Sequence, residues 1–584
     1  MNLTNNFNIP KPTVKPYSEL IKDPLIKDYL DKSFKSKGIT EDMFNISDVE
    51  YPSPFDLKDV DRGARVVLDT IKNGTGIIRL NCDYDLDGIS SGAVQYNFLR
   101  YGLGVPKERL SMLQNYRSLG NGFNNHAVKE ILGSKFKTDL IITSDHGSVD
   151  EERYKIIKDS SDIKIVVTDH HLIPNDENPS SVDAFINPQQ VDGGYSKNIS
   201  GAYVVWVLLC GVLKLIEDGE DYPFEIDYNA IRDIYPILAL TTLCDQMDMT
   251  DKLNRRIVLD GLHVLNTSKD ERWKTVKWHL KTDKVTSTDL TFRFGPIINA
   301  TGRMDNPLIG HLFLVSKGDT RRVHSDLAEA VTLNKMRKED QLRFTMQIND
   351  VLKSYSEDRS STIVKANESI LGITGPIAST LLEKKVVPTI VFSQENGVLK
   401  GSGRAPTGLH LKFLLDEIAT LYPDVLSKYG GHAGAAGVEI TEDNFERFKE
   451  VFERHAKIKM ATRAVQMKAD SLTDDSEIFD FYGSTPTVRT VRMLEALGPF
   501  GRQWNLPDAH MTLEIQSSYS DRNRNHGFYN FRNQGTPIGA FDFNGGYRLQ
   551  PRGSLVDVVG SISTEMKKGE VNLRVFVREI GLHE

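Results

Sequence analysis

Acidic and histidine side chains follow three apolar runs in the first half of the chain. The runs with their polar ends are GIIRLNCDYDLDG, DLIITSDHG and IKIVVTDHH. Apolar, β-branched runs of this length are typical of buried parallel strands, and open α/β sheets bind ligands beyond the carboxyl ends of their strands. The pattern therefore predicts one rim of ionisable side chains: Asp83, Asp85, Asp87, Asp145, Asp169, His170 and His171.

So many carboxylates at one rim repel one another unless cations neutralise them. A set rich in carboxylates and poor in histidines favours hard cations such as Mg²⁺ and Mn²⁺ over zinc. Two such ions lower the pKa of a bound water and stabilise both the attacking and the leaving oxygen of a hydrolytic reaction. The sequence therefore predicts a hydrolytic site built on two divalent metal ions.

Each motif also has a structural interpretation. DYDLDG is compatible with a loop that caps a helix or, superficially, with a calcium loop, although no distal glutamate ligand follows. Asp145 has the position of an N-cap as much as that of a ligand, and His170–His171 can be a solvated pair. Asp245 ends the apolar pattern IYPILALTTLCD, where a helix dipole disfavours a carboxylate, so a nearby cation would explain it.

Size and composition limit the class of protein. A chain of 584 residues is expected to form three or four domains. Its net charge of −8 argues weakly against nucleic-acid binding, because a metal site uses acids without leaving an acidic surface. Local basic stretches are also available at Arg321–Arg343 and in the last domain: Arg522, Arg524, Arg532, Lys567 and Lys568.

Cysteine usage and apolar runs bear on the compartment. Three scattered cysteines, Cys82, Cys210 and Cys244, fit neither a disulfide framework nor a zinc site and favour a reducing cytoplasm. The N-terminus lacks the pattern of a secretory signal, and the longest apolar run, 202–213, is too short to span a bilayer. We therefore expect a soluble cytoplasmic protein with no membrane partner.

The organisation along the chain predicts an α/β protein. Strand patterns at 76–82, 139–144, 163–168 and 184–186 alternate with helix patterns at 89–103, 201–216 and 229–243, which favours a mainly parallel sheet. A charged segment at 320–353 without Gly or Pro predicts a long connecting helix, and an Asn396–Gly397 turn predicts a hairpin in a second α/β unit. The predicted division is a lead-in at 1–75, a catalytic domain at 76–319, a connecting helix at 320–355, a smaller α/β domain at 356–455, a linker at 456–506 and a five-stranded β-barrel at 507–584.

Taken together and in order, the motifs carry a family resemblance. They are DYDLDG, SDHG, DHH, the late Asp245, INPQQVDGGYSKNISGAYVVW, FGPIINATGRMDNP, GSGRA, GGHAGAAG and LGPFGRQWNLP. The chain resembles the DHH phosphoesterase superfamily and, within it, the RecJ-type single-strand exonucleases, over about residues 75–584. The resemblance implies a DHH domain, a DHH-associated domain and a C-terminal OB-fold.

The resemblance also implies roles for the rim residues. Two Mn²⁺ or Mg²⁺ ions would be held by Asp85, Asp87, Asp145, His170 and Asp245, with Asp145 as the bridging ligand. Asp169 would orient the first histidine, His171 would contact the scissile phosphate, and Asp83 is a further member of the catalytic motif.

Two positions depart from the family pattern. Many members have a histidine where this chain has Asn81, and relatives often have a cysteine where His146 stands. Asn81 offers only a neutral amide oxygen, so we expect one metal ion to be held more weakly or through water, with His146 as a partial substitute. The departure concerns metal preference and leaves the reaction class unchanged.

Substrate contacts are expected in the second half of the chain. Arg303 and Arg404 are of a type suited to bidentate phosphate binding, and the resemblance implies this role for them together with Asn299. Without the resemblance, the default interpretation of the two arginines is that of surface residues. In GGHAGAAG, Gly431 would let the backbone approach a phosphate at a helix start, with His432 as a donor. A tight glycine–alanine packing motif is the structural alternative.

The barrel is expected to stack bases on aromatic side chains. Phe528, Tyr529 and Phe531, followed by Arg532, form the candidate cluster, and ordinary strand core is the alternative.

The predicted function is degradation of single-stranded DNA from one end, in DNA repair, recombination or replication. The resemblance implies 5′→3′ polarity and mononucleotide products, and a helicase or a single-strand-binding protein as partners. One rival is a phosphodiesterase acting on short RNA or cyclic dinucleotides. The other rival is a non-catalytic replisome scaffold that binds the strand but has lost its metals.

Overall fold

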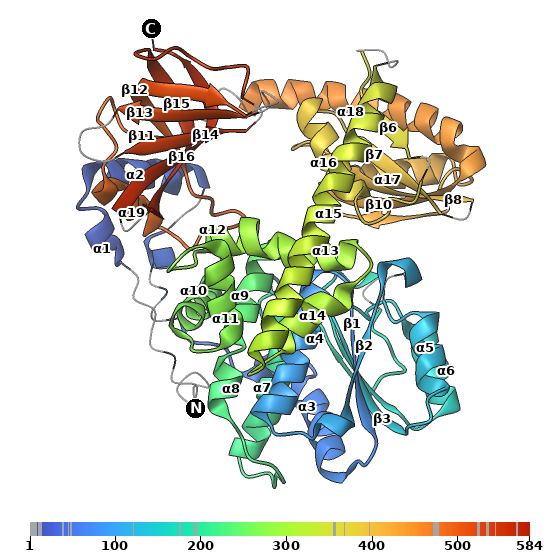
Figure 1. Ribbon diagram of the computed structural model, residues 1–584. Helices are drawn as coiled ribbons and strands as arrows, with labels where there is room; N and C mark the ends of the chain where they lie inside the picture. Colours follow the sequence, from blue (N-terminus) through green and yellow to red (C-terminus); the bar gives the residue numbers. More distant parts are fainter. Residues whose placement is uncertain are drawn as a thin grey trace.

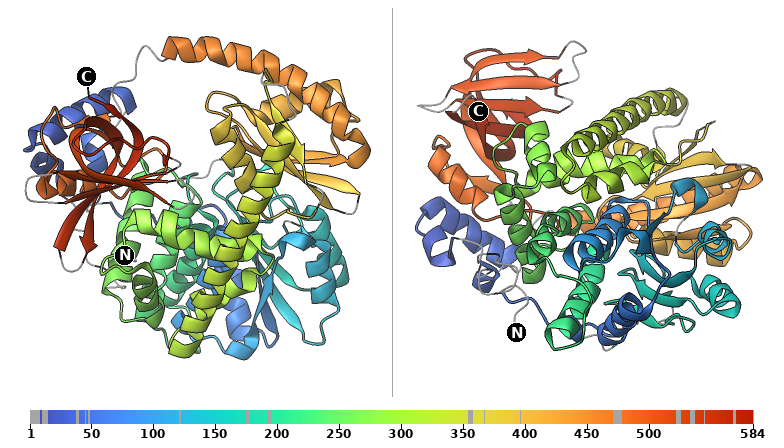
Figure 2. Two further views of the ribbon diagram at one scale, coloured as in Figure 1. Left: turned by 45° about the horizontal axis from the view of Figure 1, so that its top comes forward. Right: turned by 60° about the horizontal axis from the view of Figure 1, so that its bottom comes forward.

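The computed structural model shows two α/β domains and a β-barrel (Figure 1). Figures 1 and 2 show the barrel and the smaller α/β domain apart from each other on the same side of the larger domain, with helix α18 running between them. The structure describes residues 9, 15–37, 40–44, 46, 49–120, 122–174, 177–191, 195–353, 358–366, 368–395, 397–470, 478–521, 526–532, 537–543, 545–567 and 570–583.

The larger domain is built on a five-stranded parallel sheet in the order β2-β1-β3-β4-β5. The strands are β1 (Ile77–Cys82), β2 (Leu110–Gln114), β3 (Thr138–Ser144), β4 (Lys164–Thr168) and β5 (Ala184–Ile186). The predicted parallel sheet is confirmed. Strand β2 was not predicted, because LSMLQ lacks the continuous apolar run of its neighbours.

Helices cover both faces of this sheet. On one face lie α3 (Val60–Asn73), α4 (Leu86–Asn97) and α7 (Gly201–Glu217), and on the other lie α5 (Asn125–Leu132) and α6 (Glu151–Ser160). The domain is completed by α8 (Tyr228–Arg232), α9 (Tyr235–Cys244), α10 (Lys252–Thr267), α11 (Glu271–Leu280), α12 (Ser287–Asp289), α13 (Gly295–Arg303) and α14 (Pro307–Val315). Short 3₁₀ or π turns occur at 41–44, 54–56, 98–102, 107–109, 117–119, 290–294 and 442–444.

A 33-residue helix, α15 (Thr320–Leu352), leads to the smaller α/β domain, as predicted. Its sheet has the order β6-β7-β8-β10-β9. The strands are β6 (Thr362–Lys365), β7 (Thr389–Glu395), β8 (Val398–Arg404), β9 (Lys428–Gly431) and β10 (Ala435–Thr441), and the helices are α16 (Thr374–Lys384), α17 (Leu411–Leu421) and α18 (Phe445–Asp470). Asn396 of the predicted turn lies outside the described residues, but β7 and β8 are antiparallel neighbours, as a hairpin requires.

The C-terminal strands close into a barrel of five strands in the order β12-β13-β14-β16-β15, with β15 pairing back to β12. The strands are β12 (Asp508–Ser520), β13 (Gly527–Arg532), β14 (Ile538–Asp542), β15 (Leu555–Lys567) and β16 (Glu570–Leu582). Beside the barrel lie α1 (Tyr17–Leu20), α2 (Pro24–Lys37), α19 (Val488–Glu495) and the edge strand β11 (Ile478–Asp480). This closed order is that of an OB-fold and confirms the predicted fold class.

Two segments differ in detail from the expected organisation. Helix α18 continues to Asp470, inside the segment expected to be a linker. The expected lead-in at 1–75 contains helix α3 at Val60–Asn73. Among the helices that the structure describes, none is long and apolar enough to cross a membrane.

The segment Leu497–Pro507 attaches the barrel to the larger domain. Arg255 of α10 is fully buried, and its Nη2 donates to the carbonyl oxygens of Leu497 at 3.2 Å and Gly498 at 3.3 Å. Its guanidinium lies 4.1 Å from the ring centre of Trp504, whose Nε1 donates to the Leu497 carbonyl at 2.9 Å. Burial lowers the pKa of Arg255 to about 9.

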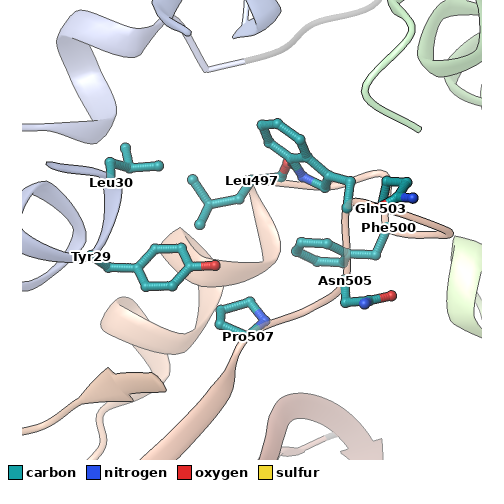
Figure 3. Close-up of a pocket in the computed structure, with 8 residues that line it drawn as sticks. Tyr29, Leu30, Leu497, Phe500, Gln503, Asn505 and Pro507 are labelled. Atoms are coloured by element: carbon teal, nitrogen blue, oxygen red, sulfur yellow. The ribbon is translucent and has the colours of Figure 1, made fainter. Parts of the chain in front are cut away.

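Figure 3 shows a pocket where this segment meets α2. It is lined by Tyr29, Leu30, Leu497, Phe500, Gln503, Trp504, Asn505 and Pro507. None of the predicted site residues lines this pocket, so the pocket is not the candidate site.

Arg255→Ala is expected to lower the free energy of unfolding by about 2–4 kcal/mol, because the Gly498 carbonyl loses a donor, the Leu497 carbonyl keeps only Trp504 as donor, and Trp504 loses a cation. Thermal unfolding followed by tryptophan fluorescence measures the change. The control is Arg447→Ala, whose exposed ion pair with Asp424 should contribute less than about 1 kcal/mol. Equal destabilisation by the two substitutions would contradict the role of Arg255.

Candidate metal centre

The first acidic motif lies in the tight loop from β1 to α4. Asp85 is the N-cap of α4, and one of its oxygens accepts from the Gly88 amide at 3.1 Å, so the capping interpretation is correct for this residue. A Cβ on Gly88 would lie 2.5 Å from the Asp83 carbonyl, which explains the glycine. Capping occupies one oxygen of Asp85, and a carboxylate can still bind a cation through the other.

Asp87 is fixed by the start of α7. Its Oδ2 accepts from the Gly201 amide at 2.7 Å and its Oδ1 accepts from the Ala202 amide at 2.9 Å. These free amides of a helix N-terminus stabilise the negative charge. The contact joins two segments more than a hundred positions apart and aims Asp87 at the ends of β3 and β4.

His170 is the point where three carboxylates meet. Its Nε2 lies 3.2 Å from an oxygen of Asp145, 3.6 Å from one of Asp245 and 3.8 Å from one of Asp87. Its Nδ1 lies 2.9 Å from the Ile199 carbonyl, which can only accept, so Nδ1 carries the proton. The lone pair of Nε2 therefore faces the carboxylates, as in a histidine that binds a metal ion.

Among the described residues, potential ligand atoms fall into three overlapping groups, each within 4.8 Å: Asp145 with His170 and His171, Asp87 with His170 and Asp245, and Asp83 with Asp85 and Asp145. Asp145 and His170 each belong to two groups. All five residues predicted as metal ligands thus lie together, and the shared position of Asp145 suits the bridging role predicted for it.

The electrostatics of the cluster favour the binding of a cation. Burial and the charge of Asp85 raise the pKa of Asp83 to about 7. Burial and the neighbouring carboxylates also raise the pKa of Asp145 and Asp245 well above the usual range, and burial raises that of Asp87. Buried oxygens of Asp83 and Asp145 have no hydrogen-bond partner among the described residues. These carboxylates fit hard divalent ions, which supply the missing positive charge.

Asp169 holds the second histidine, whereas we predicted that it orients the first. Its Oδ1 accepts from His171 Nδ1 at 2.8 Å, and its Oδ2 accepts from Ser148 Oγ at 2.6 Å. The Ile199 carbonyl orients the His170 ring instead, so that prediction was wrong. Burial lowers the pKa of His171, but the hydrogen bond and charge of Asp169 outweigh it and raise the pKa to about 9. His171 is thus a partly exposed cation beside the carboxylates.

The two departures from the family pattern lie buried near the cluster. Asn81 donates through Nδ2 to the Leu113 carbonyl at 2.6 Å, and its Oδ1 has no partner among the described residues. Burial lowers the pKa of His146 to about 4, so its ring is neutral. His146 belongs to none of the ligand groups among the described residues, and the structure therefore gives no support to its substitute role.

A group of four arginines adjoins the carboxylates. Arg303 ends α13, and burial together with the positive charges of Arg117, Arg337 and Arg404 lowers its pKa to about 10, against the opposing charge of Asp85. None of the four forms an ion pair among the described residues, although each makes polar contacts. Arg117 and Arg337 were not predicted, because no motif marks them and only the fold brings them near Arg303.

Two glycines join this arginine group to the metal loop by backbone contact. A Cβ on Gly302 would lie 1.8 Å from the Tyr84 carbonyl oxygen, and one on Gly372 would lie 1.8 Å from the Arg303 carbonyl oxygen. The β1–α4 loop, α13 and the loop before α16 are therefore stacked without an intervening side chain. Asn299 lies one turn before Arg303, with its Oδ1 buried and unpartnered within the described part.

The glycine-rich motif forms a hairpin, and the predicted helix start is wrong. Gly431 ends β9 with φ of 143°, and the His432 amide donates to the Ala435 carbonyl at 2.8 Å. Burial lowers the pKa of His432, and the charges of His171 and Arg502 contribute. The charges of the metal-site histidines thus act on His432, and the β9–β10 hairpin stands where a helix start was expected.

The barrel aromatics divide between core and surface. Tyr529 and Phe531 are buried, so the core alternative is correct for them, whereas Phe528 stacks on Tyr519 at 5.0 Å on the outside. The outer surface continues through Phe541, Phe543 and Phe576. Arg532 pairs with Glu514 at 3.3 Å. Arg522, Arg524 and Lys568 lie outside the described residues.

Asp145→Asn is expected to stabilise the metal-free protein by about 1–3 kcal/mol, because it removes one repelling charge and keeps the side-chain shape. The same variant should lose most of the stabilisation by Mn²⁺, which reaches about 2.7 kcal/mol at a hundred times the dissociation constant. Thermal unfolding in EDTA and in Mn²⁺ measures both effects. Asp218→Asn, at an exposed acid, is the control, and equal Mn²⁺ stabilisation of all three proteins would contradict the site.

Comparison with known proteins agrees with this geometry. Residues 77–235 match the model of the DHH family, N-terminal domain, and residues 362–457 match that of the DHHA1 domain. The single-stranded-DNA-specific exonuclease RecJ of Salmonella typhimurium is 30% identical over 411 residues, 68% of this chain and 69% of the relative. Its Escherichia coli counterpart is 28% identical over 486 residues, 80% of each chain.

Solved structures show the same fold. The crystal structure of RecJ in complex with Mn²⁺ from Thermus thermophilus superposes with a TM-score of 0.71 at 20% identity, covering 100% of this chain and 78% of that one. The Mg²⁺ complex from the same organism gives a TM-score of 0.67 at 20% identity, covering 100% of this chain and 77% of that one. The sequence relatives and the convergent acidic cluster lead to one conclusion: the chain belongs to the RecJ family of DHH proteins.

Proposed function

We propose that the protein is a metal-dependent exonuclease that hydrolyses single-stranded DNA from the 5′ end and releases mononucleotides. The observation that carries this proposal is the convergence of three mutually repelling carboxylates, those of Asp87, Asp145 and Asp245, on His170. Next to them lie four arginines that form no ion pair among the described residues. Two divalent ions and the phosphates of a strand are the charges that this arrangement lacks. Relatives are named single-stranded-DNA-specific exonucleases, and the Thermus structures contain Mn²⁺ or Mg²⁺.

In this mechanism the ions would be held by the predicted ligands: Asp85, Asp87, Asp145, His170 and Asp245. When bound, the ions supply a water of lowered pKa and neutralise charge at the reacting phosphate. The hydrogen bond and charge of Asp169 raise the pKa of His171 to about 9, and its exposed ring would donate the Nε2 proton in a hydrogen bond to a phosphate oxygen. Asp169 fixes the His171 ring through Nδ1 and keeps it charged.

The arginine group would bind the phosphate at the end of the strand. A terminal phosphate carries more negative charge than an internal one, and four clustered guanidinium groups suit it better than a single arginine would. Arg404 lies at the end of β8 in the smaller domain, and Arg303 lies in the larger one. Residues of both α/β domains would therefore bind the terminus of the DNA strand, and this favours an exonuclease over an endonuclease.

The outer surface of the barrel would carry the following part of the strand. Tyr519 and Phe543 are 56% and 61% exposed, and their neighbours Phe528 and Phe541 extend the same surface. Bases stack on such rings without sequence preference. The DNA must be single-stranded when it enters the site. The expected partners are therefore a helicase, which would separate the strands, or a single-strand-binding protein, which would keep them apart. The cysteine usage favours a cytoplasmic setting for this reaction.

The decisive test uses single-stranded DNA labelled at either end, with Mn²⁺ and an Asp145→Ala control. The wild type should release a labelled mononucleotide at once from the 5′-labelled strand and late from the 3′-labelled strand. The control should release none. Turnover of short RNA or cyclic dinucleotides without DNA cleavage would instead support the first rival, and tight binding without turnover would support the scaffold.

Arg404→Gln tests the grip on the strand end. With a 5′-phosphorylated strand we expect kcat/KM to fall about 10- to 100-fold, since a charge-assisted bidentate contact is lost. With a 5′-hydroxyl strand the fall should be much smaller. Arg447→Gln, on an exposed face of the same domain, is the control. An equal loss on both strands would show that Arg404 does not read the terminal phosphate.

A further inference from the structure

Two rings at the start of α17 form a stack on the surface of the smaller domain. The centres of the His410 and Phe413 rings lie 3.7 Å apart, with an angle of 10° between their planes. His410 is the N-cap of α17, and its Nδ1 accepts from the Phe413 amide at 3.3 Å. The capping bond fixes the His410 ring flat against Phe413, so the stack exists before any ligand binds.

The stack is open to solvent. Phe413 is 65% exposed and His410 is also exposed. No ring contact other than the one with His410 involves Phe413 within the part of the chain that the structure describes. A singly exposed phenylalanine needs no explanation. A preformed stack of two exposed rings differs from it, because a third flat ring can extend the stack.

The position of the stack points to the ligand. The Leu411 amide donates to the Ala433 carbonyl at 2.8 Å, and the Ala405 amide donates to the Gly434 carbonyl at 3.0 Å. These bonds hold the stack against the hairpin that carries His432. The same hairpin pairs with the arginine group, because Ala435 of β10 is the register partner of Arg404 of β8. The charges of His410 and of the metal-site residue His171 both act on His432 in this hairpin.

Beside the stack, the hairpin leaves room for a strand. A Cβ on Gly430 or on Gly434 would meet no atom within 4 Å. The smaller domain thus offers flat rings next to an open glycine backbone, in a hairpin that pairs with Arg404 of the arginine group. A nucleotide has the matching pair of groups, a flat base and a phosphate.

We propose that His410 and Phe413 form a stacking platform for one nucleobase of the bound DNA strand, close to the scissile phosphate. The inference rests on the proposed nuclease function and adds a base contact to its phosphate contacts. Stacking on an aromatic side chain contributes about 1–3 kcal/mol per base, which corresponds to about 5- to 150-fold in affinity. Since every base has a flat face, the platform would hold the strand in register without selecting its sequence.

An abasic scan tests the platform. Single-stranded 12-mers with one abasic nucleotide at each successive position are compared as substrates of the wild type, Phe413→Leu and His410→Asn. Leucine keeps apolar volume without a flat ring, and asparagine keeps an N-cap acceptor without a ring. At one position near the 5′ end, the abasic site should raise KM about 5- to 150-fold in the wild type and hardly at all in Phe413→Leu, with kcat little changed.

The control is Phe136→Leu. Phe136 is 71% exposed and lies before β3, at the edge of the sheet opposite the carboxylates, so its substitution should leave the scan unchanged. Binding of the same strands by Asp145→Ala proteins gives a readout that does not depend on cleavage. If, in that binding measurement, the effect of Phe413→Leu depends on the abasic position while the wild type cleaves no DNA, the result would support the stacking platform and contradict the nuclease function.

Cleavage by the wild type with an identical scan in Phe413→Leu would overturn the platform. So would a loss of affinity in Phe413→Leu that is equal at every abasic position, because such a loss shows no contact with a particular base.

Discussion

Electrostatic repulsion at the carboxyl edge of the parallel sheet is the constraint on which the rest of this structure depends. Asp87, Asp145 and Asp245 approach one histidine nitrogen within 3.8 Å while they are largely buried. The fold holds them there through backbone amides at the start of α7 and through the tight β1–α4 loop. The apolar helices α7 and α9 supply the hydrophobic burial that offsets part of the cost of bringing like charges together.

Much of this centre could be predicted because an apolar run followed by polar residues indicates where a buried strand ends. The three apolar runs placed Asp85, Asp145 and His170 on one rim, and the structure brings them together. Which acceptor each histidine ring would find could not be predicted, because His170 and His171 are adjacent and either could reach Asp169. The arginine group escaped detection for a related reason: Arg117 and Arg337 become neighbours of Arg303 only after long-range folding.

Two errors of local structure have simpler causes. Glycine and alanine repeats suit a tight hairpin as well as a helix start, and the pairing of β9 with β10 decides between them. In the barrel, a period of two already separates Phe528 from Tyr529 and Phe531, so the alternation itself distinguishes the outer ring from the core. A signal based on residue type alone had grouped all three.

The backbone contacts of Gly302 and Gly372 have a consequence for the product. They leave no side chain between the metal loop, Arg303 and the loop before α16. The carboxylate cluster and the arginine group are therefore separated only by packed main chain. If arginines hold the strand terminus and carboxylates mark the point of cleavage, the span between them is fixed by main chain. The fixed distance between the two groups would then determine how many nucleotides are removed in each cycle, independently of when the product is released.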